Sequence, residues 1–326
     1  MIDAPKKENA ILNLFEKRRS LALVTIIVFI FILFAVAFPG RFLKVDNLMI
    51  ILMNMMTEIF ILCGMVMVLI MGEIDLSMGA NVAFAGVLCG RFMVMYQAPT
   101  LIAVLVPLAV CVIFGLINGL IVTRIGVASF ITTLATSMIY LGFTTLLAGT
   151  GYAGFPDQIF QALGQYKVFG LIQMQIIYGV VFIAIFAYFL GRTKYFRQLY
   201  FIGGNANSAM LSGINIKKTK TVIFMISAFL SSLSGIVIAM RFNSAMVSSG
   251  TGVELRAVTA AVIGGVSFLG GTGSMIGAAT GALFLALLSN GLSMAQVPPS
   301  IQTVITGIVL VLALMADSVV EKRRRV

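Results

Sequence analysis

The sequence predicts an all-α fold, a polytopic membrane helix bundle of about ten transmembrane helices with both termini in the cytoplasm. Of the 326 residues, 60% are hydrophobic and only 10% are charged, and the mean hydropathy is +1.09. A soluble domain would carry about 25% charged residues. Apolar runs recur at the length of about 20 residues that a helix needs to cross a hydrocarbon core. The chain is therefore expected to be an integral membrane protein.

The candidate spans follow one another closely along the chain. The first follows the basic KRRS at 17–20 and lacks a small-x-small cleavage site, so we expect an uncleaved span instead of a signal peptide. GGVSFLGGTGSMIG at 264–277 interrupts the eighth and ninth, and this stretch would suit either a loop or a pair of half-helices. The candidate spans are 20–38, 48–71, 77–97, 101–123, 129–148, 172–191, 219–240, 255–269, 273–294 and 300–318.

The distribution of Lys and Arg indicates the orientation. With both termini inside, most basic residues fall in cytoplasmic segments, as the positive-inside rule requires. The net charge of +11 then reflects orientation and contact with anionic membrane lipids, and we expect no nucleic-acid partner. The basic residues in the predicted inside segments are Lys6, Lys7, Lys17, Arg18, Arg19, Arg124, Arg192, Lys194, Arg197, Lys217, Lys218, Lys220, Lys322, Arg323, Arg324 and Arg325.

The composition argues against catalysis by this chain. It has no His, so imidazole catalysis and His proton relays are excluded. Cys63, Cys89 and Cys111 each lie in an apolar stretch, where isolated cysteines behave as small hydrophobic residues, so we expect neither a disulfide nor a metal site. No Gly-Lys pair is present, and a phosphate-binding loop needs one. We therefore expect that the chain is not an enzyme.

The longest predicted cytoplasmic loop, 192–219, contains the segment GGNANSAMLSGI at 203–214. Asn205 is a candidate N-cap for a two-turn helix over 206–212, and Gly213 is a candidate C-terminal stop. Such a helix would be about 10 Å long and marginal on its own in water. It therefore needs a partner, which the pattern leaves open: the bilayer surface, its own bundle or another protein.

Polar residues within the predicted spans are candidates for a translocation pathway. Asn54, Thr57 and Glu58 share one helical face because they are spaced i, i+3, i+4. Hydrogen bonding between helices is the alternative explanation for such residues. Glu58 could instead serve a secondary transporter as a proton or cation site. The remaining candidates are Asn118 and Asn290, and Thr132, Thr133, Thr136 and Ser137 in a polar stripe along 129–148.

Four stretches together resemble the permease subunits of bacterial ABC importers for sugars, in the branch that serves ribose, galactose, xylose, allose and autoinducer-2. Two positions depart from that pattern, since Glu73 stands where Gly is common and Met78 where Val is usual. The matching stretches are MGEIDLSMG (71–79), GVASFITTLATSMIYLG (126–142), GGNANSAMLSGIN (203–215) and the run 249–292.

The resemblance implies one permease domain over 1–326, in the bacterial inner membrane, that moves a sugar-like solute by alternating access. It implies three partners: an ABC ATPase subunit that binds ATP and Mg, a periplasmic solute-binding protein, and a second permease copy or paralogue. The chain itself would need no cofactor. An ion-coupled transporter using Glu58, or a passive channel, is the alternative. The resemblance assigns docking on the ATPase to Asn205, Asn207, Ala209, Met210, Leu211, Ser212 and Gly213.

Overall fold

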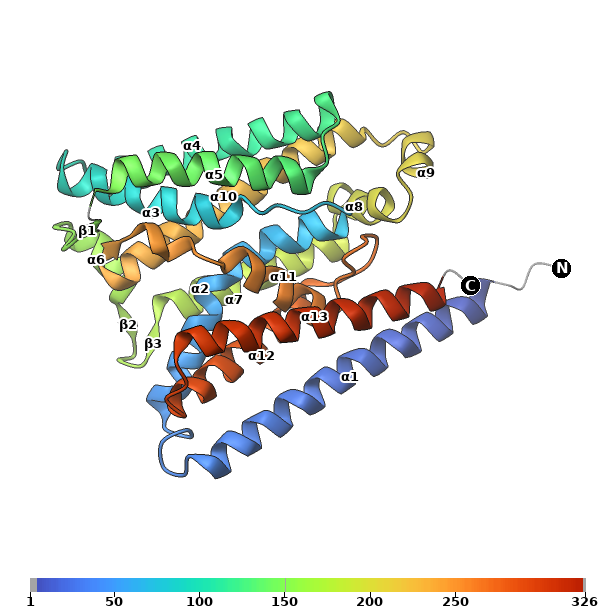
Figure 1. The fold of residues 1–326 in the computed structure, drawn as a ribbon, viewed down its shortest axis with the longest axis horizontal. Coiled ribbons are helices and arrows are strands. Elements are labelled where there is room, and N and C mark those ends of the chain that lie inside the picture. Colours follow the sequence, from blue (N-terminus) through green and yellow to red (C-terminus); the bar gives the residue numbers. More distant parts are fainter. Residues whose placement is uncertain (1–4, 150, 325–326) are drawn as a thin grey trace.

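A computed structural model describes the backbone of residues 5–149 and 151–324, and the side chains of 21–149, 151–315, 317 and 318. The basic side chains expected at the two ends, Lys6, Lys7, Lys17, Arg18, Arg19 and those of 322–325, lie outside the described residues. The described chain is a bundle of long helices with short connections (Figure 1). The all-α prediction is confirmed.

The secondary-structure elements follow the predicted segments closely. The helices are α1 (Pro5–Ala37), α2 (Val45–Ile70), α3 (Met78–Val94), α4 (Thr100–Leu120) with a π turn (Ile121–Ile125), α5 (Ser129–Ala148), α6 (Gln158–Gln165), α7 (Met174–Arg192), α8 (Lys194–Gly204), α9 (Ala206–Leu211), α10 (Ile216–Phe242), a 3-10 turn (Val247–Gly250), α11 (Val253–Ile263), α12 (Met275–Met294) and α13 (Pro299–Arg324). Two antiparallel ladders pair β1 (Tyr152–Ala153) with β4 (Ser244–Ala245) and β2 (Lys167–Val168) with β3 (Ile172–Gln173).

Every predicted span contains a helix, although the helices differ in length. Among the described residues, six helices are long and apolar enough to cross a membrane: Val45–Ile70, Thr100–Ile125, Ser129–Ala148, Met174–Arg192, Ile216–Phe242 and Met275–Met294. Three shorter apolar helices accompany them: Leu21–Ala37, Met78–Val94 and Pro299–Met315. These helices agree with the predicted polytopic membrane bundle. The count of ten spans stays a prediction.

The eighth predicted segment, 255–269, holds only the short helix α11. Its 11 residues extend about 16 Å at 1.5 Å per residue, which is roughly half of a hydrocarbon core. The chain then turns through 264–274 without helix before α12 begins at Met275. Of the two possibilities for 264–277, the structure therefore shows a loop that follows a half-length helix.

Helices α2 and α10 form the centre of the bundle. Residues 59–70 of α2 are buried without interruption, and such a helix, apolar on all sides, is typical of a core position. One layer contains α3, α4, α5 and α10, while α12, α13 and α1 lie on the opposite side of α2 (Figure 1). Close packing against α10 depends on small residues, because a Cβ at Gly235 would overlap the carbonyl oxygen of Val82 on α3.

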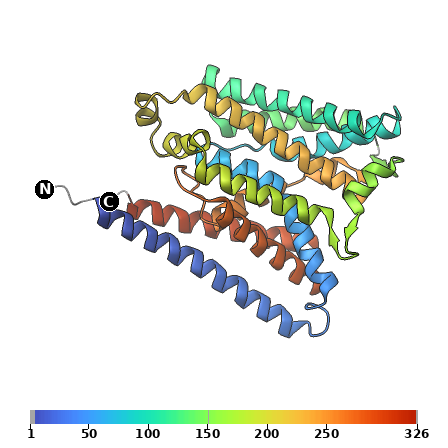
Figure 2. The same ribbon diagram turned by 180° about the vertical axis from the view of Figure 1, so that it is seen from behind.

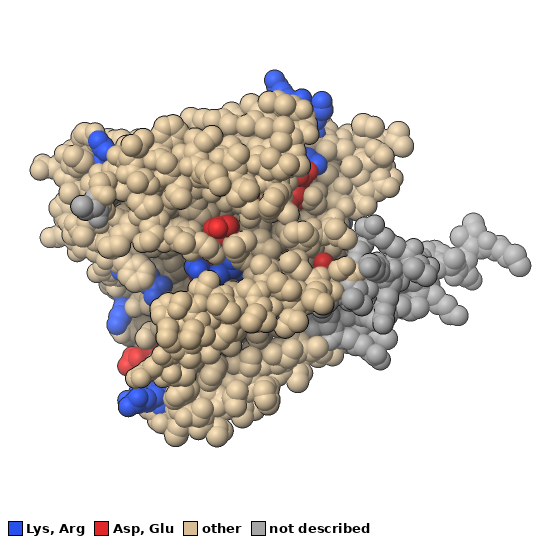
Figure 3. Space-filling model, viewed as in Figure 1, with Lys and Arg blue, Asp and Glu red and all other residues tan. Residues whose placement is uncertain are grey.

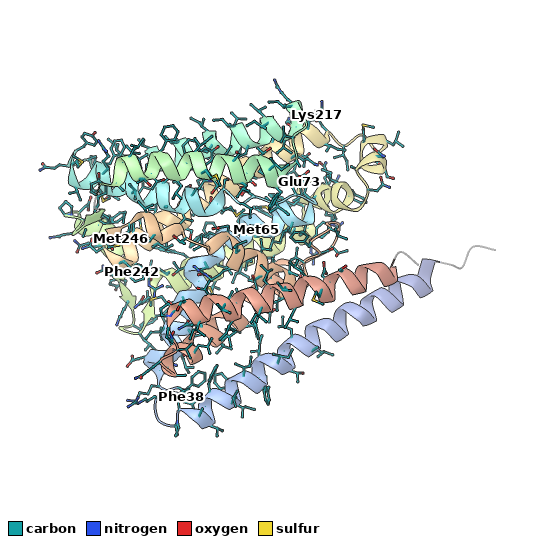
Figure 4. All side chains as sticks on the ribbon, viewed as in Figure 1. Phe38, Met65, Glu73, Lys217, Phe242 and Met246 are labelled. Carbon is teal, nitrogen blue, oxygen red and sulfur yellow. The ribbon has the colours of Figure 1, made fainter. Side chains whose placement is uncertain are left out.

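The bundle has two distinct ends. The first turn of α1, the last turn of α13 and the α8–α9 segment lie at one end in both views (Figures 1 and 2). The α6 helix and the β2–β3 hairpin lie at the opposite end (Figure 2). Side-chain positions agree: Glu73 and Lys217 lie toward the α9 end, whereas Phe242 and Met246 lie toward the other (Figure 4). Both ends of the described chain therefore share a side with the predicted coupling loop.

Candidate functional site

A cavity of about 640 Å³, lined by both apolar and polar side chains, lies between α2, α10, α11, α12 and α13. It occupies the half of the bundle remote from α9, since Phe242 at the end of α10 is part of its wall. In Figure 3, acidic and basic groups face each other across a recess near the centre of an otherwise largely uncharged face. The polar and charged lining residues are Asn54, Thr57, Glu58, Arg241, Ser249, Thr251, Arg256, Thr259, Ser289, Gln302, Thr303 and Thr306.

Arg241, in the last turn of α10, reaches across to α2. Its Nη2 donates a 2.7 Å hydrogen bond to Oδ1 of Asn54, and its Nη1 donates a 3.2 Å bond to Oγ1 of Thr57. The guanidinium carbon lies 4.8 Å from the ring centre of Phe242. Two neutral acceptors and an aromatic face hold this cation in position in the cavity wall.

Glu58 pairs with Arg256 of α11, whose Nε donates a 2.9 Å hydrogen bond to Oε1. The side chains of Glu58 and Arg256 are 39% and 40% exposed, so the ion pair is accessible to solvent in the cavity. Asn54, Thr57 and Glu58 share one face of α2, as predicted, and all three line the cavity. Their role in a translocation pathway stays a prediction. The pathway candidates taken from the sequence did not include Arg241 and Arg256, although a charged residue within or beside an apolar span is itself a signal of function.

The far wall of the cavity is formed by α12 and α13. The Nε2 of Gln302 donates a 2.9 Å hydrogen bond to the carbonyl oxygen of Val297. The hydroxyl of Ser289 donates a 3.2 Å bond to Oε1 of Gln302. Asn290, the next residue on α12, does not line the cavity. It exchanges hydrogen bonds of 2.9 and 3.2 Å with Asn47 at the start of α2, which fixes α12 against α2.

The polar stripe of α5 contacts another part of the molecule. It packs against the non-helical connection 71–77 between α2 and α3. The backbone N–H of Leu76 donates to Oγ1 of Thr133 at 3.0 Å, while Thr136 donates to the carbonyl oxygen of Thr132 on its own helix. Ser137 is half-buried. The structure thus separates these residues from the cavity, and their role in translocation stays a prediction.

Asn118 of α4 belongs to the same polar cluster as the α5 stripe. Its Nδ2 donates a 2.9 Å hydrogen bond to Oγ of Ser77, and its Oδ1 accepts a 3.3 Å bond from the hydroxyl of Tyr140. All three residues are buried. These bonds connect α4, α5 and the 71–77 connection, which is the interhelical role expected of Asn in a membrane bundle.

Helix α9 has the predicted local structure, whereas the helix α8 that precedes it was not predicted. Asn205 caps α9, since its Oδ1 accepts a 3.0 Å hydrogen bond from the backbone N–H of Ser208. Gly213 follows with a φ of +82°, the left-handed conformation that ends helices and favours glycine. Ala209 packs inward and is buried, whereas Leu211 is 86% exposed. The helix therefore presents an uncovered apolar side chain at the end of the molecule.

Residues around α9 supply further exposed groups. Asn207, Met210 and Ser212 are exposed on the helix and its last turn, and so are Lys217 and Lys218 at the start of α10. The seven predicted docking residues thus form one continuous protrusion, in which only Ala209 is buried against the bundle. A small apolar tip flanked by cations is suited to a concave, acidic partner surface.

Comparison with protein families identifies the class of this bundle. The family described as "Branched-chain amino acid transport system / permease component" matches residues 47–314. The chain belongs to this permease family. The match covers both the cavity and the α8–α9 segment of the permease.

Curated relatives of the permease act in sugar transport. It is 33% identical over 310 residues to the ribose import permease protein RbsC of Haemophilus influenzae, covering 94% of each chain. The xylose transport system permease protein XylH of the same organism is 31% identical, covering 89% of the permease and 93% of XylH. The L-arabinose transport system permease protein AraH of Escherichia coli is 32% identical, covering 81% and 80%. No solved structure matches the permease. The resemblance to sugar-importer permeases is confirmed.

Proposed function

We propose that this chain is the membrane-spanning subunit of an ATP-driven importer that moves a monosaccharide or sugar-like solute by alternating access. The observation that carries the proposal is α9, a capped helix of six residues with an exposed apolar tip at one end of a permease-family bundle. So short a helix contributes little on its own in water, and its preorganised, uncovered surface is suited to docking a partner.

The cavity would serve as the pathway for the solute. Its hydroxyl, amide and guanidinium groups can hydrogen bond to sugar hydroxyls, and its volume of about 640 Å³ falls in the usual range for small-molecule sites. Asn54, Thr57 and Glu58 would contact the solute in this pathway, with Arg241 and Arg256 beside them. The relatives named for ribose, xylose and arabinose support a pentose or a similar sugar as solute.

The proposed assembly contains further subunits. A cytoplasmic ATPase would bind ATP and Mg and receive α9, and a periplasmic solute-binding protein would deliver the solute at the opposite end. A second permease, a copy or a paralogue, would complete the pathway beside the cavity. The bacterial inner membrane, ten spans and cytoplasmic termini belong to this proposal. Its support is that both ends of the described chain lie at the same end of the bundle as α9.

Docking through α9 is tested by changing its exposed face. In the double variant Asn207→Asp/Leu211→Asp, both changed residues are exposed, so the bundle should still fold and insert. We expect the variant to lose its co-purifying ATPase, because carboxylates replace an amide and the apolar tip. The measurement is gentle purification of the tagged chain from native membranes, followed by mass spectrometry of the proteins that accompany it.

A matched control lies at the other end of the bundle. Phe169, in the β2–β3 hairpin, is 95% exposed, and Phe169→Asp changes an exposed apolar residue remote from α9. This control should retain the ATPase. Normal ATPase retention in the Asn207/Leu211 double variant would exclude docking through α9.

A further inference from the structure

The connection 71–77, together with Ile70 at the end of α2, contacts several elements at the α9 end of the bundle. The carbonyl oxygen of Ile70 accepts a 2.8 Å hydrogen bond from the N–H of Gly271 in the loop before α12. Gly203 of α8 lies so close that a Cβ there would overlap the same carbonyl oxygen. Next along the chain, the N–H of Ile74 donates a 3.1 Å bond to Oγ of Ser129 on α5. The connection thus touches α5, α8 and the loop 264–274.

An ion pair joins this connection to α10. Glu73 pairs through its Oε1 with Nζ of Lys220, in the second turn of α10. The side chains of Glu73 and Lys220 are only 13% and 21% exposed, so solvent screens this pair less than a surface pair. Lys220 follows α9 closely in the chain, because α10 begins at Ile216 and Asn215 caps it through the N–H of Lys218. The pair is therefore placed at the base of the α9 protrusion.

Further polar contacts join α10 to this connection and to α2. Oγ of Ser227 on α10 donates to Asp75 at 2.6 Å, and Oγ of Ser234 donates to the carbonyl oxygen of Thr57 on α2 at 3.0 Å. At the cavity, Arg241 of α10 holds Asn54 and Thr57 of α2. Polar contacts thus join α10 to the connection 71–77 toward the α9 end and to α2 at the cavity wall.

We propose that Glu73 and Lys220 are positioning residues that make α2 and α10 move as one body, so that displacement of α9 reaches the cavity. We base this on the proposed function, since it requires α9 to receive a movement. Neither residue lines the cavity, so the pair acts through Asn54, Thr57 and Arg241. Without the pair, α9 and the first turns of α10, before the bond of Ser227 to Asp75, would be free to shift relative to the connection. The displacement would then no longer reach α2 and the cavity.

The test measures the response of the cavity to nucleotide and needs no knowledge of the solute. Thr303 is exposed and lines the cavity, while the three native cysteines are buried. In a Thr303→Cys background, a soluble thiol reagent therefore reports cavity access in the complex with the co-purifying ATPase. The rate of modification is compared without nucleotide and with ATP plus orthovanadate. When Glu73 and Lys220 are both unchanged, we expect nucleotide to change the rate of thiol modification several-fold.

Four further variants separate a transmitting role from a merely structural one. Glu73→Gln and Lys220→Gln each remove one charge while keeping most of the side-chain volume, and we expect each to abolish the nucleotide-dependent change while the ATPase stays bound. Lys220→Arg keeps the charge and should retain the change. Arg124→Gln removes an exposed cation from the π turn after α4 and should also retain it.

The results distinguish the two proposals. A full nucleotide response in Glu73→Gln and Lys220→Gln would overturn the positioning role and leave the proposed importer intact. Loss of the response in Lys220→Arg as well would also overturn it, since the charge would then be irrelevant. If the unchanged pair gives no response although the ATPase is bound, the proposed alternating access fails at this cavity, and the positioning role fails with it.

Discussion

Ser227 on α10 donates a 2.6 Å hydrogen bond to Oδ2 of Asp75, a residue 152 positions earlier in the chain. Both side chains are buried. The other carboxylate oxygen, Oδ1, accepts bonds from the N–H and the hydroxyl of Ser77 at 3.0 and 2.6 Å. A buried carboxylate that accepts three hydrogen bonds fixes a stretch of non-helical backbone, which a membrane bundle tolerates only where protein surrounds it.

Replacing Asp75 should therefore destabilise the bundle. In Asp75→Ala the Ser77 N–H and the hydroxyls of Ser77 and Ser227 lose their common acceptor, and the cost is about 3 kcal/mol of unfolding free energy. Thermal unfolding of the purified chain in detergent should show a clearly lower Tm. Asp46→Ala, at an exposed position in the first turn of α2, is the control. Equal Tm values for the two variants would contradict the bonding described for Asp75.

Two neighbouring glycines in α8 should respond in opposite ways to alanine. A Cβ at Gly203 would overlap the carbonyl oxygen of Ile70, whereas a Cβ at Gly204 meets nothing within 4 Å. We expect Gly203→Ala to cost about 1–3 kcal/mol through overpacking. Gly204→Ala should be neutral or slightly stabilising, because alanine loses less backbone entropy than glycine. Thermal stability in detergent measures both, and a stable Gly203→Ala variant would show that α8 is free to move away from Ile70.

Asp157 makes the α4–α6 contact sensitive to acid. Its Oδ2 accepts hydrogen bonds from the hydroxyl and N–H of Thr100 at the start of α4, and its Oδ1 accepts from the N–H groups of Ile159 and Phe160 in α6. The Thr100 hydroxyl, and then these N–H groups, lower the pKa of Asp157 below its usual value. A lowered pKa in the folded state means that stability is present above the unfolded pKa, about 3.9, and is lost as pH falls through the folded value.

We therefore expect the α6 region to loosen below about pH 4, while it stays protected at neutral pH. Hydrogen exchange of the peptide covering 154–165, measured at pH 3 and pH 7 with correction for the intrinsic exchange rate, reports this change. Asp157→Asn should show the loosened state already at pH 7. A protection pattern in Asp157→Asn that matches the unchanged chain at pH 7 would rule out the capping role of the carboxylate.

Thiol labelling tests the orientation of the bundle. The three native cysteines are buried, so a single added cysteine can be labelled selectively. Because the positive-inside rule places the basic α9 end in the cytoplasm, a membrane-impermeant reagent on intact spheroplasts should label Phe169→Cys but not Lys217→Cys. After lysis both should react, as both positions are exposed. The reverse pattern would invert the topology.

Glu58→Gln tests the ion-coupled alternative. The partner of Glu58 is Arg256, and both side chains are about two-fifths exposed, so loss of the charge should cost less than about 1 kcal/mol. Uptake of radiolabelled pentoses should persist in the variant, stay resistant to a proton ionophore and still require ATP. An ion-coupled transporter would lose uptake both in Glu58→Gln and when the gradient collapses.

Much of the architecture could be predicted from the sequence because it depends on local patterns. Apolar runs located the long helices, since burial of backbone polar groups in lipid requires helix. Asn205 and Gly213 marked the ends of α9 through capping chemistry that involves only neighbouring residues. The spacing of Asn54, Thr57 and Glu58 placed three cavity residues on one face.

Only the tertiary structure decided which polar residues meet. Arg241 lies 187 positions from Asn54, and Arg256 lies 198 from Glu58, distances at which no local pattern connects residues. Helix periodicity predicted that the polar residues of α5 share one face. It did not predict that this face packs against the 71–77 connection. Likewise Glu73, a departure from the family pattern, acquires its partner Lys220 only when α2 and α10 pack together. The sequence by itself determined the helices and α9, through local hydrogen bonding and hydropathy, whereas packing over long chain separations decided the cavity and its charges.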